Sequence, residues 1–252
     1  MKQRPAFCSR PSVKFLPWLL VAMALASDCS STERLSGAPG PEAHFQTRLS
    51  ANQAVSLEIS PMLGADVSVV GSSDPHVQLD ATPLNDYSGV TITPSVNSGW
   101  LRLRLDPSGS GQRSFNWLFR HHAEAKITLR VPHLATVAIN GVNGPVRVDG
   151  VSGPLSVKIV NGAIEVNGAG TMLSLHLVNG PIDAGITDLS RVPNISIVGT
   201  NGSIDVTVPR GFKARVSAQT LLGPLDQQVN DAAAPGIVNI RLVAGPVAIE
   251  ER

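Results

Sequence analysis

The chain has 252 residues, of which 42% are hydrophobic and 15% are charged. This balance supports a buried core and excludes an intrinsically disordered chain or a coiled coil. The formal net charge is only +1. No nucleic-acid partner is therefore expected, because proteins that bind phosphate backbones present clustered positive charge.

Residues 1–26 have the three parts of a secretory signal peptide. Basic side chains precede an apolar run, residues 15–26, which ends in the small-residue triplet Ala24-Leu25-Ala26. The run has twelve residues and contains Pro17, whereas a membrane-spanning helix needs roughly 20. Cleavage removes 4 of the 20 basic residues and none of the 19 acidic ones. We therefore expect an exported protein whose mature net charge is −3 (16 − 19).

Residues 27–50 are expected to form a polar tether. Cys29 stands just after the apolar run and is followed by Ser30-Ser31-Thr32, an arrangement similar to the attachment region of a bacterial lipoprotein. Asp28, however, occupies the position where a lipobox has a small residue. Two interpretations stay open: membrane attachment through a lipid on Cys29, and plain cleavage after Ala26.

Residues 51–135 are predicted to be an N-terminal β-strand region. Apolar and polar residues alternate there, as in strands with one wet face, over residues 55–59, 67–70, 77–81, 90–93, 101–105 and 127–131. An aromatic cluster, Phe115, Trp117 and Phe119, stands out in a chain whose aromatic content is 4%. It is predicted to be either a loop that contacts a membrane or a partner, or, as we favour, a cap on an open end of the β-structure.

Residues 136–252 repeat one phrase, in which a turn pair is followed by a small residue or proline and then an aliphatic residue. Its glycines stand at positions 144, 162, 180, 202, 223 and 245, in steps of 18, 18, 22, 21 and 22 residues. Periods of this length are typical of solenoids, whose units bury their apolar faces only by stacking. We predict an all-β fold: a β-solenoid or β-helix-like stack of two-strand coils with 18–22-residue repeats.

Stacking the coils in sequence order predicts columns of equivalent side chains. The inward columns are Val146, Ile164, Ile182 and Ile204 in one sheet and Leu155, Leu173, Ile195 and Val216 in the other. The outward columns are Ser156, Ser174, Ser196 and Ser217 in one sheet and Arg147, Glu165, Asp183 and Asp205 in the other. Asn-Gly pairs favour tight reversals, and amides in register form hydrogen-bonded ladders. We expect such a ladder in the turns at Asn143, Asn161, Asn179 and Asn201.

No catalytic, cofactor-binding or metal site is predicted. The sequence contains no zinc-protease helix motif, no pair of cysteines separated by two residues, no Walker loop and no serine-hydrolase elbow. Adjacent His121 and His122 point to opposite sides of an extended chain and are therefore not predicted to share a metal ion. We expect a non-enzymatic protein without a cofactor, and a glycan-active β-helix enzyme is the disfavoured alternative.

The run from Ile127 to Val208 resembles the DUF4097 family of bacterial β-strand-repeat proteins, which are described as "putative adhesins". The resemblance rests on Val142-Asn143-Gly144-Pro145-Val146, Val160-Asn161-Gly162-Ala163-Ile164 and Thr200-Asn201-Gly202-Ser203-Ile204. With weaker copies it covers about residues 50–250. It implies a stacked-β fold in exported or envelope-anchored proteins and supplies no catalytic residues.

These observations together favour an adhesin-like binding or scaffold module in the periplasm or cell envelope. Its expected partner is an envelope protein or a surface glycan. The alternative is an envelope-stress sensor that binds a membrane partner.

Overall fold

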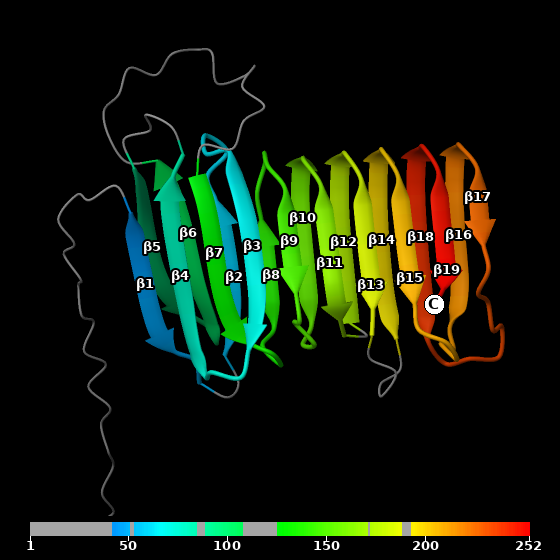
Figure 1. The fold of residues 1–252 in the computed structure, drawn as a ribbon, viewed down its shortest axis with the longest axis horizontal. Helices are drawn as coiled ribbons and strands as arrows, with labels where there is room; N and C mark the ends of the chain where they lie inside the picture. Colours follow the sequence, from blue (N-terminus) through cyan, green and yellow to red (C-terminus); the bar gives the residue numbers. More distant parts are fainter. Residues whose placement is uncertain (1–41, 51–52, 85–88, 108–124, 171, 188–192) are drawn as a thin grey trace, which may run out of the picture. The chain divides into compact units, whose positions relative to one another are not determined.

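The computed structural model describes residues 42–50, 53–84, 89–107, 125–170, 172–187 and 193–252. In this part of the chain the all-β prediction is confirmed, because its strands form two large mixed sheets (Figure 1). Sheet A contains, in spatial order, β1 (Ala43–Arg48), β4 (His76–Pro83), β7 (Ala125–Pro132), β3 (Ala65–Ser72), β9 (Val146–Asp149), β11 (Ile164–Ala169), β13 (Ile182–Ile186), β15 (Ile204–Val208), β19 (Val247–Glu251) and β17 (Leu225–Gln227). Sheet B contains β16 (Arg215–Leu222), β18 (Ile237–Ala244), β14 (Asn194–Asn201), β12 (Met172–Asn179), β10 (Leu155–Asn161), β8 (Val137–Asn140), β2 (Ala54–Ile59), β6 (Trp100–Pro107) and β5 (Val90–Asn97).

Between β8 and β15 the chain alternates between the sheets and advances by one strand position in each. β10 pairs in parallel with β8 and β12, and β11 pairs in parallel with β9 and β13. Leu155 lies beside Leu173, and Ile164 lies beside Ile182. One repeat of the sequence is therefore one step along both sheets in this segment.

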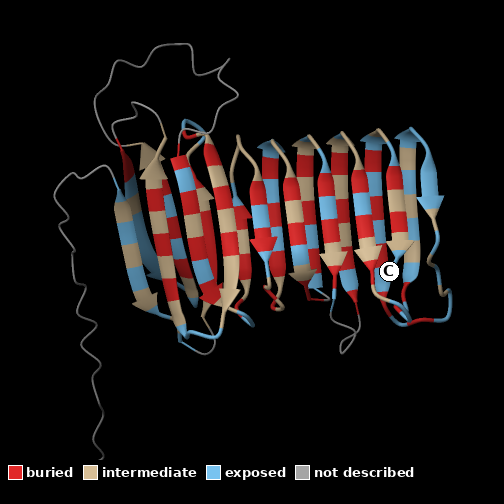
Figure 2. Ribbon diagram, in the orientation of Figure 1, coloured by how far each residue is buried: buried red, intermediate tan, exposed pale blue. Residues whose placement is uncertain are grey.

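Aliphatic side chains of the two sheets form one core. Buried and exposed residues alternate along the strands (Figure 2), and the inward residues Val146, Ile164, Leu155 and Leu173 are all at most 3% exposed. Burying an aliphatic side chain of this size contributes about 1.5–3 kcal/mol. Branched side chains repeated at the same height therefore stabilise each coil against its neighbours.

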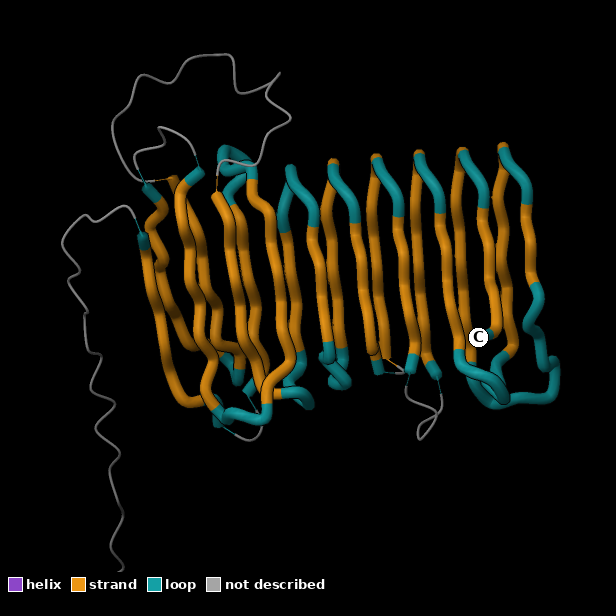
Figure 3. The backbone as a smooth tube through the Cα atoms, in the orientation of Figure 1, coloured by secondary structure: helices purple, strands orange, loops and turns teal. Residues whose placement is uncertain are grey.

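The Asn-Gly turns follow one another along one rim of the sheets (Figure 3). Gly180 has a φ of 132°, a conformation that L side chains rarely adopt. A Cβ built on Gly180 would also overlap the carbonyl oxygen of Gly162 in the neighbouring coil. The close approach of successive turns thus requires glycine at this position.

The asparagine amides of these turns form a hydrogen-bonded ladder. The Nδ2 of Asn161 donates to the Oδ1 of Asn143 over 3.0 Å, and the Nδ2 of Asn179 donates to the Oδ1 of Asn161 over 2.8 Å. Asn201 donates in the same way to Asn179 over 3.0 Å. The ladder therefore joins four consecutive turns across coils.

After residue 208 the coils do not stack in sequence order. β18 lies between β14 and β16, and β19 lies between β15 and β17. Ile195 consequently neighbours Val238 and not Val216, and Ser217 is displaced from its predicted column in the same way. The prediction was wrong here because every coil carries the same turn phrase. The spacing indicates the length of a coil but not which coil lies beside it.

The N-terminal strands belong to the same two sheets. In sheet B, β2 lies between β8 and β6, and in sheet A, β3 lies between β9 and β7. Beyond them, β1, β4 and β5 add antiparallel pairs at the N-terminal end of the sheets. β1 falls inside the segment 27–50, which was expected to be a tether. Ala43 and Phe45 of β1 pack against the core, so the β-structure begins earlier than predicted.

Several predictions fall on residues outside the described ranges. They are the signal peptide 1–26, the lipid attachment at Cys29 and the role of the cluster Phe115, Trp117 and Phe119. In the described ranges, no helix is long and apolar enough to cross a membrane.

Candidate functional site

The two sheets carry opposite charge in the C-terminal half. Strands β9, β11, β13, β15, β19 and β17 of sheet A contain one arginine, Arg147, and seven carboxylates, which are Asp149, Glu165, Asp183, Asp205, Asp226, Glu250 and Glu251. Strands β8, β10, β12, β14, β18 and β16 of sheet B contain no Asp or Glu, and their basic residues are Lys158, Arg215 and Arg241. Over these six strands the outer face of sheet B is therefore the one suited to an anionic ligand.

On sheet A the charged side chains form a row across neighbouring strands. The Nη1 of Arg147 donates to the Oδ1 of Asp66 over 3.0 Å, and its Nε lies 3.5 Å from the Oε2 of Glu165. Asp183 and Asp205 lie side by side further along the row. Among the described residues no group of three or more His, Cys, Asp or Glu side chains is placed to hold a metal ion, so this row is not assigned as a metal site.

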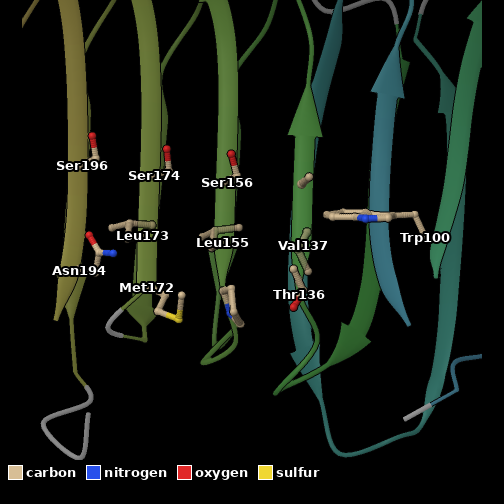
Figure 4. A pocket seen from close by; sticks show the side chains of 12 residues that line it. Trp100, Thr136, Val137, Leu155, Ser156, Met172, Leu173, Ser174, Asn194 and Ser196 are labelled. Carbon is tan, nitrogen blue, oxygen red and sulfur yellow. The ribbon is translucent and has the colours of Figure 1, made fainter. Parts of the chain in front are cut away.

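A shallow groove of about 260 Å³ crosses the outer face of sheet B (Figure 4). Small side chains in register on four neighbouring strands form its floor, and these are Ala138, Ser156, Ser174 and Ser196. One flank is formed by Thr136, Pro154, Met172 and Asn194. Trp100 stands at one end.

Trp100 reaches the groove from a strand that does not adjoin it. It begins β6, which is separated from β8 by β2. Its neighbour on β2 is Ala54, whose methyl side chain leaves room for an indole to lie over that strand. Figure 4 shows the indole on its edge, extending from β6 towards Val137 of β8. Trp100 is half-buried, so one part of its surface rests on the sheet and another is available to a ligand.

The groove offers hydroxyl groups, an amide, a thioether and an indole. Nucleophilic catalysis by a serine needs a base within hydrogen-bond reach and a further group that orients the base. The nearest imidazole in sequence, His176, lies in the next outward row beside Lys158, and its Nδ1 is buried without a hydrogen-bond partner. The four floor strands contain no carboxylate that would orient it. This arrangement suits binding by stacking and hydrogen bonds.

The structure places the predicted serine column in the groove, except for Ser217, which lies on the edge strand β16. The ladder asparagines lie in the turns and do not line the groove. The sequence patterns do not single out Trp100, Met172 and Asn194 as site residues. The available signal for Trp100 was its place at the start of an alternating strand, where it stands at an outward position.

Comparison with known proteins gives distant likenesses among solved structures. No family model matches the sequence, and no curated protein matches it. A "putative cell adhesion protein" from Clostridium sporogenes aligns with 84% of this chain and 99% of its own, at 14% identity and a TM-score of 0.49. A "putative adhesin" from Bacteroides fragilis aligns over 84% and 99%, at 13% identity and a TM-score of 0.33. A "putative lipid binding protein" from Parabacteroides distasonis aligns over 84% and 97%, at 14% identity and a TM-score of 0.23. At these values the likenesses carry no argument about a ligand.

Proposed function

We propose that this chain is an exported, non-enzymatic β-repeat protein of the bacterial cell envelope that works as an adhesin-like module. In this proposal the stacked coils are a β-solenoid, and a surface glycan binds in the groove of sheet B. The observation that carries the proposal is the groove, with an indole at one end and a row of hydroxyl groups along its floor. Export rests on the signal-like residues 1–26, and a lipid on Cys29 remains the alternative to a free protein.

An extended sugar polymer fits the chemistry of the groove. Indoles present a large apolar surface with a polar edge, which suits the C–H face of a sugar ring. Neighbouring strands are about 4.8 Å apart, so Ser156, Ser174 and Ser196 offer hydroxyl groups at regular intervals across the strands. A polymer lying across the strands meets several equivalent partners in succession.

The charge of sheet B favours a polymer that carries anionic groups. Lys158 lies in the row beside the groove serines, and Arg241 lies in the same row three strands further on. Because the outward residues of the sheet B strands β8, β10, β12, β14, β18 and β16 include no carboxylate, nothing on these strands repels a carboxylated or phosphorylated sugar. The ionic contribution is screened by salt, so binding is expected to weaken as the ionic strength rises.

The proposal is tested by measuring binding of the purified protein to immobilised neutral and carboxylated polysaccharides. Trp100→Ala is expected to weaken binding about tenfold, which corresponds to ~1.4 kcal/mol. Ser174→Leu is expected to abolish binding by filling the groove, while Ser68→Leu on the outer face of sheet A is the matched control and leaves binding unchanged. Failure of every polysaccharide to bind, or equal effects of Ser174→Leu and Ser68→Leu, would overturn the proposal.

A further inference from the structure

The two sheets finish at one end on β16 and β17, and the outer edge of each pairs with no described strand. Three leucines are exposed at this end: Leu221 by 76%, Leu222 by 66% and Leu225 by 45%. Val216 and Ala218 point inward but are only partly buried against the core. Apolar side chains of the core layer therefore reach solvent here, beside unpaired backbone groups.

The opposite end is protected. Its edge strands β1 and β5 are antiparallel to their neighbours, and β5 contains Pro94, which has no N–H to offer. The exposed residues of β5 are mostly polar, namely Thr91, Thr93, Ser95 and Asn97, with one large hydrophobic residue, Val96, among them. Proline and polar side chains on an edge strand discourage pairing with another chain. The end at β16 and β17 thus exposes three leucines, whereas the edge strands described at the opposite end expose one large hydrophobic residue and include a proline.

Part of the β16 edge is already covered by the segment that follows β17. The backbone N–H of Val216 donates to the Oδ1 of Asn230 over 3.2 Å, and that of Asp231 donates to the carbonyl of Ala214 over 3.0 Å. Alternate residues of a strand direct their N–H groups to the same side, so those of Ala218 and Thr220 face the same edge as that of Val216. The uncovered stretch therefore runs from Ala218 towards Leu222, whose carbonyl accepts from the N–H of Gly245 over 2.7 Å. This stretch lies level with β17, because a short turn joins the two strands.

We propose that a second copy of this chain docks on this end, with β16 of each copy pairing antiparallel with β17 of the other. A single extended peptide pairs with one edge and leaves the other exposed, whereas the same end of a second copy supplies both edges at the correct separation. β16 and β17 run in opposite directions (Figure 1). A twofold axis parallel to the strands therefore brings β17 of one copy antiparallel to β16 of the other at the same height.

The side chains fit this arrangement. Rotation about this axis does not shift β16 and β17 along their length. It therefore places Leu222 of one copy opposite Leu225 of the other on the inner face, and Leu221 opposite Asp226 on the outer face. Arg215 and Arg241 lie at this end of sheet B, and Asp226 and Glu250 lie at this end of sheet A. The basic face of one copy then continues into the acidic face of the other. A twofold axis perpendicular to the sheets would instead join like-charged faces, which is unfavourable.

Sedimentation velocity over a range of protein concentrations tests the association. The protein is expected to be a dimer, and Leu222→Asp is expected to weaken dimerisation at least tenfold. Leu134→Asp is the matched control, because Leu134 is 69% exposed in the turn between β7 and β8, and it should leave the dimer intact. Ala218→Pro removes an N–H from the open edge and should also give a monomer. A wild-type monomer at all concentrations, or equal effects of Leu222→Asp and Leu134→Asp, would overturn the proposal.

Cysteine crosslinking tests the pairing of the strands. Chains carrying Leu221→Cys are mixed with chains carrying Asp226→Cys, both with Cys8 and Cys29 replaced by serine. A disulfide between the two kinds of chain is the expected product. Crosslinking of the Leu221→Cys chains only with each other would show that β16 pairs with β16 and would refute the arrangement. Far-UV circular dichroism spectra of the Leu222→Asp and Ala218→Pro variants that match the wild-type spectrum exclude misfolding as the cause of a lost dimer.

Discussion

Asp205 occupies a position that disfavours its negative charge. Partial burial, the neighbouring carboxylate of Asp183 and the carboxylate of Glu250, in that order, raise the pKa of Asp205 above its ordinary value. The folded chain therefore binds a proton at Asp205 more tightly than the unfolded chain does. By linkage, this contribution to stability is present below the ordinary pKa and is lost as the pH rises through the raised pKa.

Asp205→Asn is therefore expected to stabilise the protein at pH 7. Like charges opposed on neighbouring strands cost about 0.2–1 kcal/mol, and thermal unfolding should show a gain of this order. The gain should vanish when the pH falls below the ordinary pKa of Asp, where the carboxyl is already neutral. Asp183→Asn removes the same repulsion, so the gains of the two variants should be less than additive; full additivity would contradict the assignment.

At the scale of the elements, the asparagine ladder fixes one turn against the next. Asn179 donates to Asn161 and accepts from Asn201, whereas Asn143 at the end of the ladder only accepts. The amides are exposed, and hydrogen bonds of this kind contribute about 0.5–1.5 kcal/mol each. An inner member of the ladder should therefore matter more than an end member.

Asn179→Ala is expected to lower the free energy of unfolding by about 1–2 kcal/mol, because it removes two ladder hydrogen bonds. Asn143→Ala removes one and should cost about half as much. Urea unfolding with an unchanged m-value measures both. Equal losses for the two variants would show that the amides act singly and not as a ladder.

The sequence spacing predicts neighbours correctly only where chain order and spatial order coincide. From β8 to β15 a step of one repeat is a step of one strand, so Leu155, Leu173 and Ile195 stand in the predicted column. Beyond Val208 the same spacing fails, since identical turn chemistry lets a coil fit beside any other coil. β1 was missed because its inward residues, Ala43, Phe45 and Thr47, form a weak apolar pattern.

The groove shows the same limit for the candidate site. Its serine floor follows from the repeat, and Ser156, Ser174 and Ser196 were predicted to share a face. The end of the groove does not follow from the repeat, because Trp100 comes from β6. No local pattern indicates that β2, which carries Ala54, lies between β6 and β8. The residues of a site that belong to the repeat can thus be predicted from the sequence, while residues from outside the repeat depend on the order of the strands.

At the scale of the whole molecule, the last strands of the chain lie inside the sheets and not at their edge. Val238 of β18 is 2% exposed, whereas its neighbour Val216 on the edge strand β16 is only partly buried. Val238→Ala is expected to cost about 2 kcal/mol, because it removes buried methyl groups and leaves a cavity.

Val216→Ala should cost less than about 1 kcal/mol, since its side chain is partly in water already. Both variants are compared by urea unfolding in the Leu222→Asp background, where association of two copies does not contribute. Stacking in sequence order would make β18 the outermost strand of sheet B and would reverse this ranking.

The positions of β18 and β19 also determine where the protein can change in length. Both neighbours of each strand are occupied, so a coil duplicated after Glu251 finds no free edge beside the coil it copies. A duplicated unit placed between Asn161 and Asn179 instead inherits parallel partners on both sides and a place in the amide ladder. Relatives of this chain are therefore expected to gain or lose coils in the middle of the repeat region and to conserve the order of strands at its two ends.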